Sequence, residues 1–386
     1  MTQHSRKTGG GRSRFRLAAA GAGVLTLALA ACGSSNNSTS SSSGAAANAC
    51  ATGSGPGPWG WPGDSTNGYQ PNHEPDVNCD GKVVLGILSP GDTNDHGYYE
   101  SFVDTAKQFA TQNGWSVTIV DKINPADVVT QARNLCRQHV DMVAVAASEL
   151  KDAIPVASEP GCKNTVWYVA GGQGVTQTNY FVQSQDDATE SGYSSGVAAG
   201  ELMKSSGSHK AGFVTGPQAD FAVTFAKAFK AGIVSVVPDA SLLVTYTGDF
   251  NDSAKGVEAA KAQIAQGIGI IYPYLGGSTF AVAAEAQKTN IPVLTPGTDN
   301  CTVPSPKFAV SVIFSPGDYF AAALGPFKAG NLKVGVARIW HMGKDPVPHT
   351  KICSPTGDQQ TQVDNVEKQI GAGTIVPANI IKNVNL

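Results

Sequence analysis

The chain has 386 residues, and its 27 basic and 30 acidic side chains give a formal net charge of −3. This length is enough for two domains of ordinary size with substantial cores. The slightly acidic balance excludes the concentrated positive surface that nucleic-acid phosphates require, so we expect no nucleic-acid partner.

Residues 1–31 have the layout of a bacterial secretion signal. Five basic side chains and no acidic one precede an apolar run from about 17 to 31, which is too short for a comfortable membrane span. The run ends in Leu-Ala-Ala-Cys-Gly, which resembles the lipobox of bacterial lipoproteins, with Cys32 as the lipidated residue. An ordinary signal peptide with an incidental cysteine is the alternative. We expect a protein held by a lipid anchor on the extracytoplasmic face of the cell membrane.

Six cysteines remain after Cys32, and an even number outside the cytosol predicts three disulfides. Proximity in the sequence favours the pairs Cys50–Cys79, Cys136–Cys162 and Cys301–Cys353. A zinc site is not expected, because no Cys-x-x-Cys pair occurs and the seven histidines are scattered. We expect no metal or other cofactor.

The region from 32 to 80 precedes the first apolar strand pattern. Residues 33–49 are Ser, Asn, Gly and Ala, which is the composition of a flexible tether. Residues 50–80 are rich in Gly and Pro and predict an irregular arm clipped by Cys50–Cys79.

From residue 82 onward, short apolar runs alternate with helical patterns. Helices are predicted at about 98–113 and 126–139, and strands at 83–88, 117–120, 142–147, 165–170, 211–215, 242–246, 268–272 and 291–294. Short, nearly all-apolar strands separated by helices indicate an α/β fold with parallel sheets covered on both faces. The series starting at 125 recurs about 125 residues later, so we expect two similar lobes with a ligand cleft between them.

The loop after the first strand is the leading candidate for ligand contact. It lies where a strand ends and a helix begins, and free amides there favour polar ligand groups. Asp95, with Asn94 beside it, is placed to bind a ligand, and Tyr98 is placed to stack on a flat one. The alternative is that Asn94 or Asp95 merely caps the helix.

Two later positions are further candidates. Gly277 follows a strand and opens a helix, so its amide is expected to face the cleft, although a simple helix start is the alternative. Asp299 lies just past the strand at 291–294, where a carboxylate can hold a pair of ligand hydroxyls. Its alternative role is to form a turn beside Cys301.

The segment 192–196 matches the Gly-x-Ser-x-Gly pattern of a nucleophile elbow around Ser194. Such an elbow needs its serine on a sharp turn directly after a strand. Here the strand near 180–183 ends several residues earlier, and the motif continues with helical spacing, which favours close helix packing by small residues. We expect no catalytic residue; a secreted hydrolase would need Ser194 activated by His341 or His349.

Several segments, taken in order, resemble the basic membrane protein (BMP) family of purine nucleoside receptor-like (PnrA-like) lipoproteins, the substrate-binding components of ABC importers. They are Asp-His-Gly-Tyr at 95–98, Tyr-Ser-Ser-Gly at 193–196, Phe-Val-Thr-Gly at 213–216, the Phe- and Gly-containing helix at 225–232 and Gly-Asp-Phe-Asn-Asp-Ser-Ala-Lys-Gly at 248–256. Together they span most of residues 82–345. Tyr99 and Glu100 depart from the pattern, because the family often has Asn and Gln there.

The resemblance implies the type I periplasmic-binding-protein fold, in which two Rossmann-like lobes are joined by a hinge. We expect one lobe at 82–187 plus about 300–327 and the other at 188–299 plus about 328–386. It also implies that Asp95 and Tyr98 touch the ligand, that Phe221 or Phe250 supplies a second aromatic face, and that Asp299 reads a sugar-like hydroxyl pair. The expected partners are a small polar ligand, nucleoside-like by preference, and an ABC permease. A sugar receptor or a sensor of the same fold is the alternative.

Overall fold

The computed structural model describes Cys50, residues 70–171 and residues 175–386. The expected signal, Cys32, the tether and most of the Gly/Pro-rich arm lie outside this part of the chain. Within it, we find no helix with both the length and the apolar character needed to cross a membrane.

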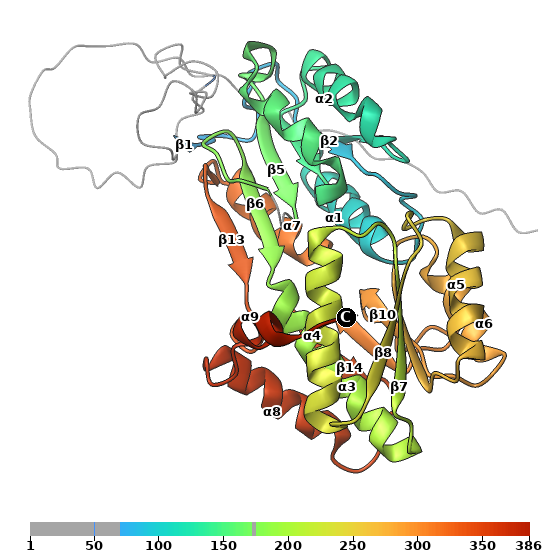
Figure 1. The fold of residues 1–386 in the computed structure, drawn as a ribbon. Coiled ribbons are helices and arrows are strands. Elements are labelled where there is room, and N and C mark those ends of the chain that lie inside the picture. Colours follow the sequence, from blue (N-terminus) through green and yellow to red (C-terminus); the bar gives the residue numbers. More distant parts are fainter. Residues whose placement is uncertain (1–49, 51–69, 172–174) are drawn as a thin grey trace, which may run out of the picture. The chain divides into compact units, whose positions relative to one another are not determined.

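The first sheet consists of six parallel strands in the order β13-β6-β5-β4-β2-β3 (Figure 1). All residues of β4 and β5 are buried, as expected for apolar strands covered on both faces. The strands are β2 (Val84–Leu88), β3 (Ser116–Val120), β4 (Met142–Val145), β5 (Val166–Ala170), β6 (Val182–Asp186) and β13 (Ala337–Trp340).

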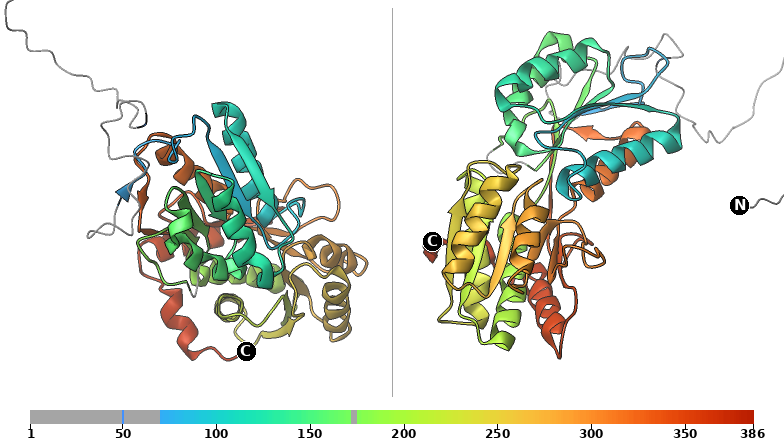
Figure 2. Two further views of the ribbon diagram at one scale, coloured as in Figure 1. Left: turned by 90° about the horizontal axis from the view of Figure 1, so that it is seen from above. Right: turned by 90° about the vertical axis from the view of Figure 1, so that its right-hand side faces the viewer.

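Helices cover both faces of this sheet, and together they form what we call the first lobe. Two of them, α1 and α7, run side by side on one face (Figure 2, right). There the rings of Phe102 and Phe320 stack with centroids 4.4 Å apart. The opposite face is covered by α2 and a 3-10 segment, η3, around Leu135 and Trp167. These elements are α1 (Tyr98–Asn113), η2 (Pro125–Asp127), α2 (Val128–Arg137), η3 (Ser148–Ser158), η4 (Pro160–Cys162) and α7 (Pro316–Lys328).

The second sheet begins as β8-β7-β9 and continues through a bridge between Ile271 and Val293 into β10-β11-β14. Only β14 pairs antiparallel among these described strands. The strands are β7 (Lys210–Thr215), β8 (Ser241–Tyr246), β9 (Ile270–Tyr274), β10 (Leu294–Gly297), β11 (Val310–Ile313) and β14 (His349–Ile352).

The helices on this sheet complete what we call the second lobe. One hydrophobic cluster lies under α3, α4 and α8, and another lies under α5 and α6, which Figure 1 shows side by side in gold. The helices are α3 (Ala188–Ser206), α4 (Asp220–Val236), α5 (Ser253–Ala265), α6 (Thr279–Gln287), α8 (Gln359–Gly371) and α9 (Pro377–Ile380). The remaining short elements are β1 (Gln70–Pro71), β12 (Lys333–Val334) and η5 (Ile381–Asn383).

The lobe boundaries after residue 299 differ from the sequence expectation. β11 lies in the second sheet between β10 and β14, although 300–327 was expected in the first lobe. β13 is the edge strand of the first sheet, although 328–386 was expected in the second lobe. The physical reason is pairing: β11 runs parallel to β10, and β13 runs parallel to β6. The chain therefore passes between the lobes three times, after β6, after β11 and after β13.

The three predicted disulfides are all present. Cys136–Cys162 joins the end of α2 to η4 within the first lobe, and Cys301–Cys353 joins the segments after β10 and β14 within the second. Cys50–Cys79 closes a segment of 29 residues before β2. The prediction of pairing by proximity is thus confirmed.

Candidate functional site

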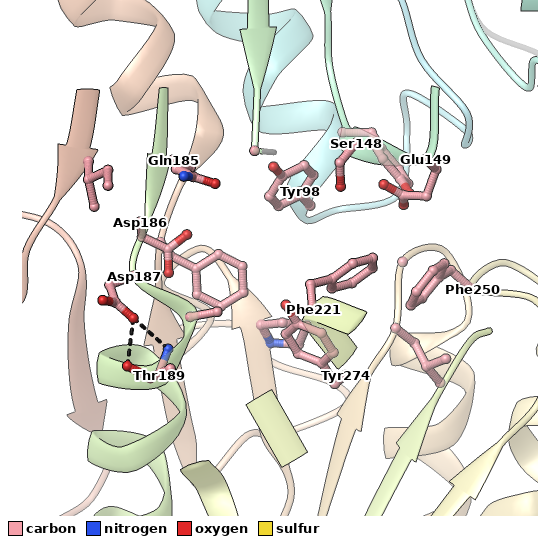
Figure 3. Close-up of a pocket in the computed structure, with 18 residues that line it drawn as sticks. Tyr98, Ser148, Glu149, Gln185, Asp186, Asp187, Thr189, Phe221, Phe250 and Tyr274 are labelled. Atoms are coloured by element: carbon pink, nitrogen blue, oxygen red, sulfur yellow. Dashed lines mark hydrogen bonds between the residues drawn. The ribbon is translucent and has the colours of Figure 1, made fainter. Parts of the chain in front are cut away.

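A cavity of about 270 Å³ lies between the two lobes, beside the first chain crossing (Figure 3). Its walls are the carboxyl ends of β4, β6, β9 and β10, together with the first turns of α1, α3 and α4. Carboxyl ends of parallel strands and helix N-termini are where α/β folds bind ligands. This cavity is therefore the candidate binding site.

Aromatic rings from both lobes line the cavity. Tyr98 and Tyr99 come from the start of α1, whereas Phe221, Phe250, Tyr274 and Phe314 come from the second lobe. Figure 3 shows Tyr98 on one side of the cavity with Phe221 and Tyr274 on the other. The rings of Phe221 and Phe250 stack with centroids 5.8 Å apart. This arrangement suits a flat ligand, because rings on both sides offer stacking contacts.

The polar lining is dominated by three carboxylates. Glu149 follows β4 and accepts a hydrogen bond of 2.9 Å from the hydroxyl of Tyr99. Asp186 ends β6 and accepts one of 2.7 Å from the hydroxyl of Ser191. Asp187 caps α3 by accepting bonds from the amide and hydroxyl of Thr189, at 2.8 and 2.6 Å.

Burial changes the acidity of this lining. Desolvation raises the pKa of Asp186 to about 6, and the nearby charges of Asp187 and Glu190 act in the same direction. Desolvation also raises the pKa of Glu149 and raises that of Tyr98 well above its ordinary value. Asp186 is consequently mostly ionised near neutral pH, while Tyr98 stays a neutral hydroxyl.

Three of the sequence candidates lie on the cavity: Tyr98, Phe221 and Phe250. Asp95 does not line it. Instead its carboxylate accepts the amides of Gly97, Tyr99 and Glu100 at 3.0, 3.2 and 2.9 Å, which corresponds to the capping alternative. By holding these amides, Asp95 fixes the first turn of α1 and so positions Tyr98.

The other sequence candidates lie away from this cavity. Asn94 is exposed and donates to Asp92. The amide of Gly277 donates to Oδ1 of Asn251 at 2.9 Å, and it is the neighbouring Gly276 that lines the cavity.

Asp299 forms a turn beside Cys301, which was the alternative to a ligand-binding role. Its carboxylate accepts the amide of Cys301 at 3.0 Å and pairs with Lys351 at 2.7 Å. Contact of any of these residues with a ligand stays a prediction.

Ser194 lies in the middle of α3 rather than on a turn. It is fully buried, and its hydroxyl donates to Oε1 of Glu367 at 2.7 Å instead of to a histidine. His341 is hydrogen-bonded to Glu190 at 3.1 Å. The helical reading of this motif is confirmed, because α3 and α4 pack closely at its glycines.

Sequence reasoning missed Glu149, Asp186, Asp187 and Tyr274. Each lies at or just after the carboxyl end of a strand, which is the same signal that selected Asp299. The acidic pair at 186–187 was not selected as a site candidate because the strand before it was expected to end near 183. In the structure β6 continues to Asp186.

Two α/β lobes joined by three crossings, with a lined cavity between them, define the two-lobed solute-binding class of fold. A solute-binding protein of an ABC transporter system from Conexibacter woesei matches with a TM-score of 0.58 at 21% identity, over 76% of this chain and 98% of its own. One from Aeropyrum pernix matches with a TM-score of 0.67 at 16% identity, over 76% and 92%. The expected type I periplasmic-binding-protein fold is thereby confirmed.

The chain belongs to the family described as ABC transporter substrate-binding protein PnrA-like, whose sequence model matches residues 82–379. The ABC transporter nucleoside-binding protein BmpA of Lactococcus lactis is 28% identical over 219 residues, 55% of this chain and 60% of that protein. The CD4+ T-cell-stimulating antigen of Listeria monocytogenes is 26% identical over 53% of this chain and 57% of its own length. The alignments thus span less than two thirds of these relatives. Because the family consists of transporter receptors and not enzymes, the hydrolase alternative for Ser194 is wrong.

Proposed function

We propose that this protein is the lipid-anchored solute receptor of an ABC importer and that it binds a nucleoside-like solute in the cavity between its lobes. The observation that carries the proposal is the facing of Tyr98 by Phe221 and Tyr274 across that cavity. A flat base fits between such rings, and the carboxylates around them accept hydrogen bonds from hydroxyl and amino groups. Family membership and the similarity to the nucleoside-binding protein BmpA of Lactococcus lactis support it.

Binding would bridge the two lobes. Tyr98 belongs to the first lobe and Phe221 to the second, so a ligand that touches both favours the arrangement in which the lobes approach. The three crossings next to the cavity are the hinge, and closure about such a hinge is a common response of binding proteins to their ligands. Burial of the rings against the ligand supplies affinity, and the carboxylates supply orientation. The closed form would then be presented to the permease.

The proposed cellular location rests on the N-terminal secretion signal. Cys32, once lipidated, would hold the receptor on the extracytoplasmic face of the cell membrane, and residues 33–49 would serve as the tether. Metabolic labelling with a fatty-acid analogue tests this: Cys32→Ser should lose the label and leave the membrane fraction. If the variant kept the label and stayed in the membrane fraction, the proposed lipid anchor at Cys32 would be contradicted.

A thermal-shift screen of the mature protein against nucleosides, free bases, pentoses and hexoses tests the ligand. A ligand at 100 times its Kd stabilises the folded state by about 2.7 kcal/mol, which is readily measured. We expect nucleosides to raise the melting temperature. A clear shift with a sugar and none with any nucleoside would overturn the nucleoside assignment and support the sugar receptor.

A further inference from the structure

The cavity has hydrogen-bond acceptors at both of its ends. Figure 3 shows Asp186 and Glu149 on opposite sides of the Tyr98 ring, with Asp187 beside Asp186. These two ends come from different strands, since Asp186 ends β6 and Glu149 follows β4.

Both carboxylates retain acceptor capacity. An ionised carboxylate has about four lone-pair positions. The side-chain donors to Asp186 and Glu149 are the hydroxyls of Ser191 and Tyr99, at 2.7 and 2.9 Å. A ligand that brings N–H or O–H donors to each end therefore finds acceptors that are fixed in place.

The described charged side chains that line the cavity are all acidic. Among the described residues that line it, three are carboxylates and none is Lys, Arg or His. A ligand with an anionic group would bring negative charge next to half-buried carboxylates, and like charges brought together in an enclosed site are strongly disfavoured.

We infer that the cavity selects nucleosides whose base carries amino donors, and that it rejects their phosphorylated forms, with Asp186 and Glu149 accepting the donors at its two ends. The inference rests on the proposed function and narrows its substrate class. A nucleoside fits because it carries ribose hydroxyls at one end and base N–H groups at the other.

Matched ligand pairs test the inference by calorimetry at about pH 7.5. Adenosine and purine riboside differ by the 6-amino group, and guanosine and inosine differ by the 2-amino group. Hydrogen bonds to charged acceptors predict that the amino form of at least one pair binds about tenfold more tightly or better. Adenosine monophosphate should bind at least about 100-fold more weakly than adenosine.

Equal affinity within both pairs, or binding of the monophosphate as tight as that of adenosine, would overturn the inference and leave the proposed function standing. Absence of binding by any nucleoside would instead overturn the proposed function itself.

Two variants identify the acceptors, Asp186→Asn and Glu149→Gln, with the exposed Asp152→Asn as the matched control. At least one of the two should lose the preference for the amino form, and the one that does marks the end taken by the base. Wild-type preference in both variants would overturn the assignment of these carboxylates. Unliganded melting temperatures verify folding, and the wild-type ligand pairs carry the test if a variant fails to fold.

Discussion

Gly196 of α3 and Gly232 of α4 touch where these two helices cross, and a Cβ built on Gly196 would lie 2.9 Å from the Cα of Gly232. Neither backbone can move without disturbing the core beneath both helices. Gly196→Ala should therefore destabilise the fold by about 3 kcal/mol, the upper part of the range for overpacking.

The matched control is Gly325→Ala in α7, where a Cβ meets nothing within 4 Å. Alanine there should be neutral or stabilise by up to about 1 kcal/mol. Urea unfolding of both variants checks the contrast, and equal effects would contradict the close-packing role of Gly196.

Tyr98 is expected to stack on the ligand. Tyr98→Leu should weaken the binding of adenosine, or of whichever nucleoside gives the largest thermal shift, by about 0.5–1.5 kcal/mol or more. Tyr98→Phe keeps the ring and should keep most of the affinity. Calorimetric titration of both variants separates the ring from the hydroxyl, and an unchanged Kd in Tyr98→Leu would remove Tyr98 from the site.

Glu367 makes stability depend on pH. Its Oε1 accepts bonds from Ser194 and from the amide of Thr350, and burial raises its pKa to about 7 from an ordinary 4.5. The folded state therefore binds the proton of the Glu367 carboxyl more tightly than the unfolded state does. The contribution of this protonation to the free energy of unfolding is complete below about pH 4.5 and is lost as the pH rises through 7.

Glu367→Gln should remove part of that dependence, on the order of 2–3 kcal/mol between about pH 5 and pH 8. Asp141, whose pKa burial also raises to about 7, should account for a remaining slope. Urea unfolding across this pH range measures both. A slope unchanged by the substitution would show that Glu367 does not titrate there.

The disulfide Cys301–Cys353 spans 52 residues. Replacing both cysteines with serine should lower the free energy of unfolding by about 3–4 kcal/mol, because the unfolded chain regains the freedom of that loop. Replacing Cys136 and Cys162, which span 26 residues, should cost somewhat less. Melting temperatures of the two double variants provide the comparison, and an unaltered value for the first would contradict this account.

Apolar periodicity predicted the regular elements well. The helix expected at 98–113 coincides with α1, and the pattern at 142–147 and 165–170 located β4 and β5. These elements are set by burial, which leaves a direct mark on the sequence. The strand expected at 291–294 is displaced to Leu294–Gly297, where backbone pairing with β11 continues past the apolar residues.

The site was less predictable, because the same residue type serves two purposes. A carboxylate at a helix start either caps the helix or binds a ligand, and local sequence does not distinguish Asp95, which caps, from Asp186, which lines the cavity. Both residues lie at or after the end of a strand of the first sheet, and the difference depends on where each strand end lies relative to the cavity. Local sequence also does not show which sheet β11 and β13 join, because this is set by their long-range pairing with β10 and β6.

The place of β13 also constrains the order in which the protein can assemble as it is synthesised. The first sheet lacks its edge strand, and the core beneath Phe102 lacks α7, until residues 316–340 have left the ribosome. By then most of the second lobe has already emerged, but β14, α8 and α9 have not. The lobe that is translated first is thus completed only after most of the other lobe has been synthesised, and neither lobe can be excised as one continuous stretch of chain.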